Sequence, residues 1–212
     1  MFLDFELLAA KDRYKLLTAT VVPRPIALVS TRNEDGSTNA APFSFFNVFS
    51  EDPLLVVLGL QSKPDLSPKD TTHNIRLTGE FVVNLVDESI AEKMVVCAAN
   101  FPKGESEIPT AGLSLEKSEK IDVDYIVDAP VSLECHRVTV LQFAKTRDLA
   151  IGEIVGFHAR DGLIDPDTLR IDWGKYNSIG RLYADKYIRT HDRFSMKIPA
   201  YEDAVNGERQ GD

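Results

Sequence analysis

The chain has 212 residues, of which 43% are hydrophobic and 27% are charged. Its 33 acidic and 24 basic side chains give a net charge of −9, which repels nucleic-acid phosphates and anionic membranes, so neither is an expected partner. No apolar run approaches the ~18 residues that span a bilayer, and the beginning of the chain lacks the pattern of a secretory signal. We therefore expect a cytoplasmic protein.

The first predicted element is a helix over residues 4–17, which Asp4 can cap. Pro23-Arg24-Pro25 then excludes helix and predicts an extended approach to a strand over Ile26–Thr31. The Asp35-Gly36 turn leads into a second strand through Asn39 and Ala41.

The segment after this second strand is the anomaly of the sequence. Phe43, Phe45, Phe46 and Phe49 alternate irregularly with Ser44 and Asn47, and we interpret the segment as a loop. Such a mixture suits a planar ligand that needs apolar faces and directed hydrogen bonds. A buried corner that plugs one end of a barrel is the alternative.

The rest of the chain reads mainly as strands with helical excursions. A doubly wound sheet would require regular alternation of strands and helices, so we predict one antiparallel barrel domain, with a core of about residues 20–190 and a frayed acidic tail over 200–212. The predicted strands lie over 54–60, 80–86, 131–140 and 149–158, the helices over 69–77 and 89–99, and a long loop that could be a lid or a subunit contact over 100–112.

Motifs for nucleophilic or metal chemistry do not occur in the sequence. It has no GxGxxG, Walker, HExxH or GxSxG pattern, and its four histidines lie far apart, so we nominate no catalytic residue and no metal ligand. Cys97 and Cys135 stand in no CxxC or Cys/His cluster, and we expect two buried, reduced thiols.

Lys69-Asp70-Thr71-Thr72 places a cation and hydroxyl groups at the start of a predicted helix. The free N–H groups and dipole of a helix start attract a phosphate, although an Asp or Thr there is more often a cap. Together with the aromatic segment, this site describes a ligand with a planar ring and a terminal phosphate, which is the shape of FMN. Ser30, Thr31 or Asn39 would meet the polar edges of the ring.

Five segments, in this order, resemble the flavin reductase-like family: PRPIALVST, the Asp35–Asn47 segment, KDTTHNI, TGEFVVNLV and GRLYADKY. The resemblance covers about residues 22–188. It implies a homodimeric six-stranded split barrel that binds FMN at the subunit interface. The implied FMN-binding residues are Ser30, Thr31, Asn39, Ala41, Pro42, Phe43, Ser44, Phe45, Phe46, Asn47, Lys69, Asp70, Thr71, Asn74 and Arg181.

Within this set we expect Thr31 and Ser44 to make polar contacts with the ring, and Arg181 to close over the ligand. Many relatives have Arg-Leu-Gly-Gly where this chain has Arg181-Leu182-Tyr183-Ala184, which predicts an altered pocket beside that segment. The loop over 100–112 and the tail beyond Thr190 also exceed the shortest flavin reductases.

Three functions follow from the resemblance. The first is an NAD(P)H:flavin oxidoreductase that passes hydride to flavin N5 and supplies reduced flavin to a separate monooxygenase component. The second is an electron carrier that keeps FMN as a prosthetic group and serves another acceptor. The third is a barrel that binds flavin or a partner without catalysis.

Overall fold

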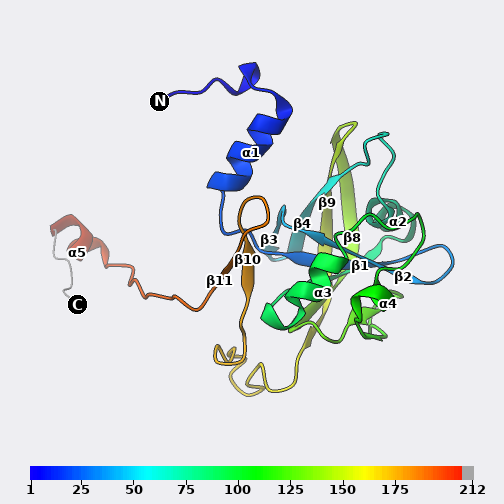
Figure 1. Ribbon diagram of the computed structural model, residues 1–212. Helices are drawn as coiled ribbons and strands as arrows, with labels where there is room; N and C mark the ends of the chain where they lie inside the picture. Colours follow the sequence, from blue (N-terminus) through cyan, green and yellow to red (C-terminus); the bar gives the residue numbers. More distant parts are fainter. Residues whose placement is uncertain (207–212) are drawn as a thin grey trace.

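Seven strands form one antiparallel sheet at the centre of the computed structural model, which describes residues 1–206 (Figure 1). The order in the sheet is β2-β1-β5-β8-β9-β4-β3. The strands are β1 (Ala27–Arg32), β2 (Thr38–Phe43), β3 (Phe46–Glu51), β4 (Leu54–Gln61), β5 (Glu80–Leu85), β8 (Val131–Ala144) and β9 (Arg147–Ala159). The prediction of a mainly β chain with helical excursions is confirmed.

The predicted number of six strands is wrong, because most of the aromatic segment is strand and not loop. Residues Phe46–Glu51 pair with β4, and the register shifts between Val48 and Ser50. Such a shift interrupts the alternation of apolar and polar residues by which a strand is recognised in a sequence. Val48 and Phe49, which are neighbours in the chain, are both exposed.

Only Ser44 and Phe45 separate β2 from β3, although these strands lie at opposite edges of the sheet. The sheet must therefore curl until its two edges meet. At the meeting point Gly59 of β4 donates its backbone N–H to the carbonyl of Phe45 at 2.7 Å. The aromatic segment thus closes one corner of a barrel.

The interior of the barrel is apolar and tightly packed. Phe81, Leu58 and Val83 are fully buried in it. Gly152 on β9 makes room for the Phe81 ring, because a Cβ at this glycine would lie 2.3 Å from Phe81 Cζ. Cys97 and Cys135 are buried free thiols, as predicted.

The N-terminal region contains two helical segments instead of the single helix predicted over 4–17. Asp4 accepts a hydrogen bond from the N–H of Glu6 and so caps only the short turn η1 (Phe5–Leu7). The helix α1 (Ala10–Thr20) continues beyond Leu17, and the hydroxyls of Thr18 and Thr20 in its last turn donate to the carbonyls of Tyr14 and Leu16. It stands apart from the barrel (Figure 1).

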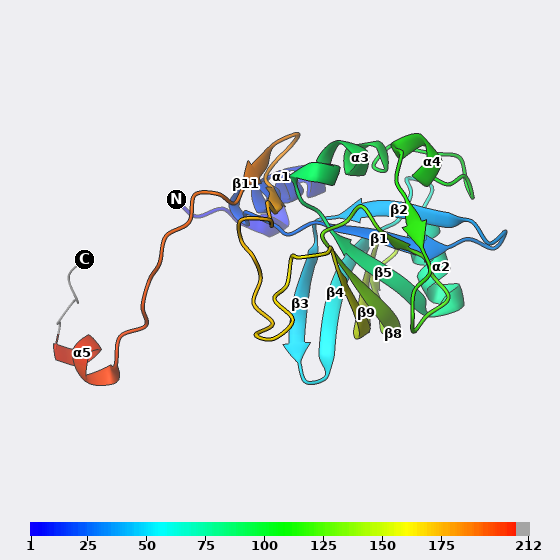
Figure 2. The same ribbon diagram turned by 90° about the horizontal axis from the view of Figure 1, so that it is seen from below.

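The other helices lie outside the barrel (Figure 2). The predicted helix over 69–77 is α2 (Asp70–Thr78), and it ends at Gly79, whose φ of 75° is left-handed. The helix predicted over 89–99 is shorter than expected: Asp87 caps only the preceding 3₁₀ turn, through the N–H of Ser89, and the α-helix that follows has no side-chain cap and ends at Val96. The remaining short elements are η2 (Glu88–Ile90), α3 (Ala91–Val96), α4 (Ile108–Ala111) and the ribbons β6 (Leu115–Glu116) with β7 (Tyr125–Ile126) and β10 (Ile179–Arg181) with β11 (Tyr187–Arg189).

After β11 the chain runs away from the barrel as an extended segment and ends in α5 (Tyr201–Asn206) (Figures 1 and 2). The tail predicted over 200–212 therefore begins with a helix, and its last six residues lie outside the described residues. Among residues 1–206, no helix has the length and apolar composition to cross a membrane.

Candidate functional site

A large cavity of about 770 Å³ lies beside the barrel, between the end of β2 and the start of α2. Asn39, Ala41, Pro42 and Phe43 of β2 form one wall. The opposite side consists of the loop before α2, the start of α2 and the segment that follows α3, including Lys63, Lys69, Asp70, Thr71, Cys97, Asn100, Phe101 and Glu107. Seven of the sequence-predicted site residues therefore line a single cavity.

The start of α2 has the features that bind a phosphate group. The first backbone bond of the helix runs from the N–H of His73 to the carbonyl of Lys69, so the N–H groups of residues 70–72 precede it. Lys63 contacts Asp70 at 3.1 Å, and therefore part of its charge is already neutralised. Lys69 is exposed and has no carboxylate partner among the described residues. It is the cation available at this end of the cavity.

Asp70 remains ionised beside this cation. Burial by itself raises the pKa of its carboxyl group, but the N–H of Gly104 and the ammonium of Lys63 hold this pKa below its usual value. Through the Gly104 contact, Asp70 also fastens the long loop over 100–112 to α2.

A buried chain of hydrogen bonds fixes α2 against β1 and β2. The Asn39 side-chain amide donates to the Thr71 hydroxyl at 3.0 Å, and both Asn39 and Asn74 donate to the hydroxyl of Thr31. Asn74 continues the chain to Asn33 at 2.8 Å. Thr31 has no exposed surface and lies within this network beneath the cavity, and its contact with the ring stays a prediction.

Glu107 is a buried carboxylate at the wall of the large cavity. Its Oε2 accepts the backbone N–H of Ala40 at 2.9 Å, and the side chain is 7% exposed. Burial raises the pKa of this carboxyl group, and the nearby charge of Asp70 raises it further. Burial also raises the pKa of the Cys97 thiol to about 12, so this thiol stays protonated and is no nucleophile.

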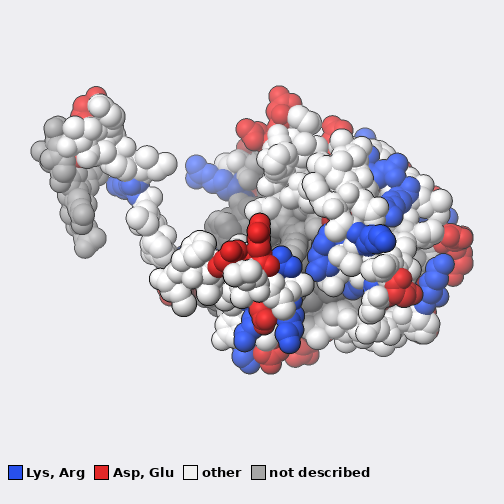
Figure 3. Space-filling model, turned by 90° about the horizontal axis from the view of Figure 1, so that it is seen from above, with Lys and Arg blue, Asp and Glu red and all other residues white. Residues whose placement is uncertain are grey.

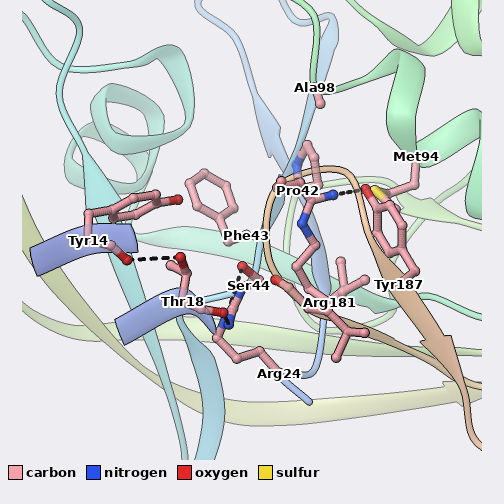
Figure 4. Close-up of a pocket in the computed structure, with 13 residues that line it drawn as sticks. Tyr14, Thr18, Arg24, Pro42, Phe43, Ser44, Met94, Ala98, Arg181 and Tyr187 are labelled. Carbon is pink, nitrogen blue, oxygen red and sulfur yellow. Dashed lines mark hydrogen bonds between the residues drawn. The ribbon is translucent and has the colours of Figure 1, made fainter. Parts of the chain in front are cut away.

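A second hollow of about 320 Å³ adjoins the first (Figure 4). Pro42, Phe43 and Ala98 line both hollows and therefore form their shared wall. The remaining lining comes from α1, the corner after β2, α3 and the β10–β11 ribbon: Tyr14, Thr18, Arg24, Ile26, Ser44, Met94, Arg181, Leu182, Ala184 and Tyr187. The predicted residues Ser44 and Arg181 thus lie at this second hollow and not at the first.

Six predicted residues line neither hollow. Thr31 and Asn74 belong to the network under the cavity, and Ser30 is fully buried and donates to the carbonyl of Asp124. Phe46 packs into the core. Phe45 and Asn47 are exposed, and Phe45 stacks at a tilt on Tyr14 with ring centroids 6.1 Å apart. Their assignment to a ligand stays a prediction from the sequence.

Arg24 and Glu107 are the site residues that sequence reasoning did not identify. Arg24 is 7% exposed, and its guanidinium donates to the carbonyls of Thr18, Val21 and Leu182. A cation between two prolines was a weak signal for Arg24. Glu107 gave none, because its partner Ala40 is 67 residues away in the sequence.

Charged side chains of both signs are scattered among uncharged ones on the face drawn in Figure 3, and side chains of both colours lie beside the hollow near its middle. Among residues 1–206, no group of three or more His, Cys, Asp or Glu side chains could hold a metal ion. A curled antiparallel barrel with a large cavity at a helix start is the architecture of a ligand-binding barrel.

Comparison with known proteins identifies the family. Residues 19–180 match the model of the flavin reductase like domain, and this chain belongs to that family. A 2-nitrobenzoate 2-nitroreductase from Pseudomonas fluorescens is 40% identical, with a TM-score of 0.87 over 95% of this chain and 98% of that one. The nitrilotriacetate monooxygenase component B from Bacillus cereus is 34% identical, with a TM-score of 0.87 over 92% and 98% of the two chains.

A more distant structure confirms the type of barrel. A Shewanella frigidimarina protein described as having a split barrel domain is 22% identical and superimposes with a TM-score of 0.79, over 94% of this chain and 100% of that one. The fold of this chain is therefore the split barrel that the sequence predicted, with seven strands in its main sheet.

Proposed function

We propose that this chain binds FMN in the large cavity and catalyses its reduction by NADH or NADPH. The observation that carries the proposal is the cavity of about 770 Å³ that runs from the start of α2 to the end of β2, where it shares a wall with the second hollow. One end offers N–H groups and a free lysine for a phosphate, and the other offers an apolar wall for a planar ring. Membership of the flavin reductase like domain family agrees with this arrangement.

Each part of the cavity has a distinct task in this proposal. Lys69, Thr71 and the N–H groups of α2 would bind the phosphate, and Ala41, Pro42 and Phe43 would lie against the ring. Bound FMN would supply the chemistry, because its ring accepts a hydride. The buried network of Thr31, Asn39 and Asn74 would keep the two ends in register, and no side chain is needed as an acid or base.

The second hollow is the route by which a nicotinamide or another small molecule would reach the ring. It shares Pro42 and Phe43 with the large cavity, so a molecule bound in it would lie beside whatever these two residues hold. Tyr14 and Tyr187 provide flat apolar surfaces there.

We also propose a homodimer. The side chains of Tyr14 and Leu17 on α1, and of Val21 directly after it, are 51%, 48% and 60% exposed, and most of α1 lies apart from its own barrel. Exposed apolar area of this kind is typical of an interface. A separate oxygenase that consumes the reduced flavin is the partner suggested by the relative named as a monooxygenase component.

Reduction of a nitroaromatic compound by the bound flavin is a second candidate function. The relative that is 40% identical is named as a 2-nitrobenzoate 2-nitroreductase, and it matches nearly the whole of this chain. The two functions share the flavin site and differ in what oxidises the reduced flavin.

The visible spectrum of the purified protein with added FMN, followed by anaerobic addition of NADH or NADPH, tests the proposal. We expect FMN to bind and its yellow absorbance to bleach with at least one nicotinamide cofactor. Re-oxidation by 2-nitrobenzoate then separates the second candidate from the first. Bound FMN that neither nucleotide reduces would instead indicate an electron carrier, and failure to bind FMN would contradict both functions.

A further inference from the structure

Two arginines line the second hollow without any acidic partner. Arg32, Arg76, Arg160 and Arg189 each contact a carboxylate, whereas Arg137 and Arg147 donate to backbone carbonyls. Within residues 1–206, Arg24 and Arg181 contact none. In a chain with a net charge of −9, the second hollow therefore brings together two guanidinium groups that form no direct ion pair. The nearby acid is Asp185, whose carboxyl pKa is lowered by Lys186 and, less strongly, by the charge of Arg181.

Neutral oxygen atoms hold both guanidinium groups in place. Arg24 donates to the carbonyls of Thr18 at 2.7 Å, Val21 at 2.9 Å and Leu182 at 2.5 Å. Arg181 donates to the hydroxyl of Tyr187 and to the carbonyl of Ala184. These bonds orient the two guanidinium groups. Because every acceptor is a neutral oxygen atom, none of the bonds is an ion pair.

The two charges act on each other. Burial lowers the pKa of the Arg24 guanidinium, Tyr14 opposes this shift, and the charge of Arg181 lowers the pKa again. An anion bound between the two groups would remove this repulsion. Arg181 is the better direct ligand, because only two of its five N–H donors are used by the chain and its side chain is half-buried.

Apolar side chains form part of the remaining wall of the hollow, together with the hydroxyl-bearing residues Thr18 and Ser44. Ile26, Pro42, Phe43 and Met94 line it, and the Tyr187 ring lies under Arg181 with the guanidinium carbon 4.5 Å from the ring centroid (Figure 4). A volume of about 320 Å³ accommodates one small ring and not a whole dinucleotide. A planar fork of N–H donors matches a carboxylate better than a single point charge does.

We propose that the second hollow is a binding site for a small aromatic carboxylate, whose carboxylate group contacts Arg181 in the field of Arg24 and whose ring lies against Pro42 and Phe43. That this molecule exchanges electrons with a flavin in the adjoining cavity rests on the proposed function. The binding itself does not.

Isothermal titration of the full-length protein with benzoate tests the proposal. Benzamide has the same shape without the charge, and acetate has the carboxylate without the ring, so these two probes isolate the two halves of the site. We expect benzoate to bind at least tenfold more tightly than either. Equal affinities for benzoate and benzamide would overturn the role of the arginines, and equal affinities for benzoate and acetate would overturn the role of the ring.

Arg181→Gln should weaken benzoate roughly 10- to 100-fold, because it removes charge-assisted hydrogen bonds, and should leave benzamide unchanged. Arg181→Lys keeps the positive charge without the planar fork of donors, so its benzoate affinity should lie between those of the wild type and Arg181→Gln. Lys186→Gln is the matched control, since it removes an exposed cation of the same ribbon that is paired with Asp185. Thermal unfolding of each variant identifies a folding defect, and Arg181→Lys is read in place of Arg181→Gln if the latter is unstable.

The FMN affinity of the same preparations distinguishes the two levels of the proposal. Binding of FMN without binding of benzoate would overturn the carboxylate site and leave the proposed function intact. Binding of benzoate without binding of FMN would overturn the proposed function and leave the carboxylate site intact.

Discussion

Lys69 is the residue that should distinguish a phosphorylated ligand from an unphosphorylated one. It lies at the start of α2 and, in the described part of the chain, contacts no carboxylate. Lys69→Ala should therefore weaken FMN by about 1.5–3 kcal/mol, the range of a charge-assisted hydrogen bond, and leave riboflavin nearly unchanged. Fluorescence titration with both flavins measures the difference, and Lys145→Ala at the tip of the β8–β9 hairpin is the control. Equal losses for both flavins would contradict a phosphate contact.

Ala184 adopts a backbone conformation that suits glycine. Its φ of 48° lies in the left-handed region, which an L side chain rarely adopts. Ala184→Gly should relieve this strain and stabilise the fold by about 0.5–1 kcal/mol. Urea unfolding at equilibrium measures this free energy. Gly112→Ala, at a glycine with φ of 63° and an open surrounding, is the reverse control and should destabilise by a similar amount.

Glu107 should make the fold less stable as the pH rises. Because burial raises the pKa of its carboxyl group above the ordinary 4.5, the folded state holds this proton more tightly than the unfolded state. Its contribution is complete below pH 4.5 and is lost as the pH rises through the raised pKa. Glu107→Gln keeps an acceptor for the N–H of Ala40 and removes the charge, so its Tm should exceed that of the wild type at neutral pH.

The difference in Tm between Glu107→Gln and the wild type should shrink as the pH falls, and it should be smallest below pH 4.5, where Glu107 is mostly protonated in both states. Calorimetry of the FMN-free proteins over this range measures it, and the difference cancels effects of other titrating groups. A constant difference at every pH would show that the amide changes packing and not charge.

At the scale of single elements, Gly59 on β4 supports the corner where the barrel closes. A Cβ at this position would lie 2.9 Å from Phe45 Cβ and 3.5 Å from the Phe45 carbonyl oxygen, which accepts the Gly59 N–H. Gly59→Ala must therefore move the turn at Ser44 and Phe45, at a cost of about 1–3 kcal/mol.

The same change should disturb the second hollow, because Ser44 lies 3.5 Å from Arg24. Thermal unfolding and benzoate titration together measure both effects. Gly174→Ala is the control, since its new Cβ would meet only the end of the Asp172 side chain. An unchanged Tm in Gly59→Ala would indicate that the barrel corner is loosely packed.

The elements that the sequence predicted well are those with local signals. The helix α2 was located to within one residue, because its start is polar and Gly79 ends it in a left-handed conformation. The strand β3 was missed, because its register shift removes the alternation by which strands are recognised. The break between the first helical turn and α1 was also missed, because Ala9 at the N-cap of α1 has no side chain that could cap the helix.

Site residues that lie in continuous segments of the sequence were predictable. Those brought together by contacts between distant parts of the chain were not. Asn39 to Phe43 and Lys69 to Thr71 are continuous segments, and each lines the large cavity as expected. Arg24 reaches Leu182, which is 158 residues away, and Glu107 reaches Ala40, so only the folded chain brings them to the site. Thr31 has small polar neighbours in the sequence, as residues of a ligand site often do, but the folded chain buries it completely.

At the scale of the whole molecule, the C-terminal segment beyond β11 carries apolar side chains that do not pack against its own barrel. Phe194, Met196 and Ile198 are 84%, 83% and 97% exposed on an extended segment that leaves the body of the molecule (Figure 1). Alternate apolar residues are the pattern of a strand with one buried face. A second copy of this chain, in the homodimer that we propose, is the surface on which this face would be buried.

Replacement of all three side chains by serine should therefore dissociate the dimer. Burial of each is worth roughly 1.5–3 kcal/mol, so the loss of three corresponds to a dissociation constant at least about a thousandfold higher. Size-exclusion chromatography with light scattering over a dilution series measures this shift. Phe143→Ser, at the exposed tip of β8 and 72% exposed, is the control that removes apolar surface elsewhere. If the triple variant stays a dimer while Phe143→Ser dissociates, the β8–β9 hairpin and not the C-terminal segment forms the contact, and if the wild type is a monomer at every concentration, the homodimer itself is wrong.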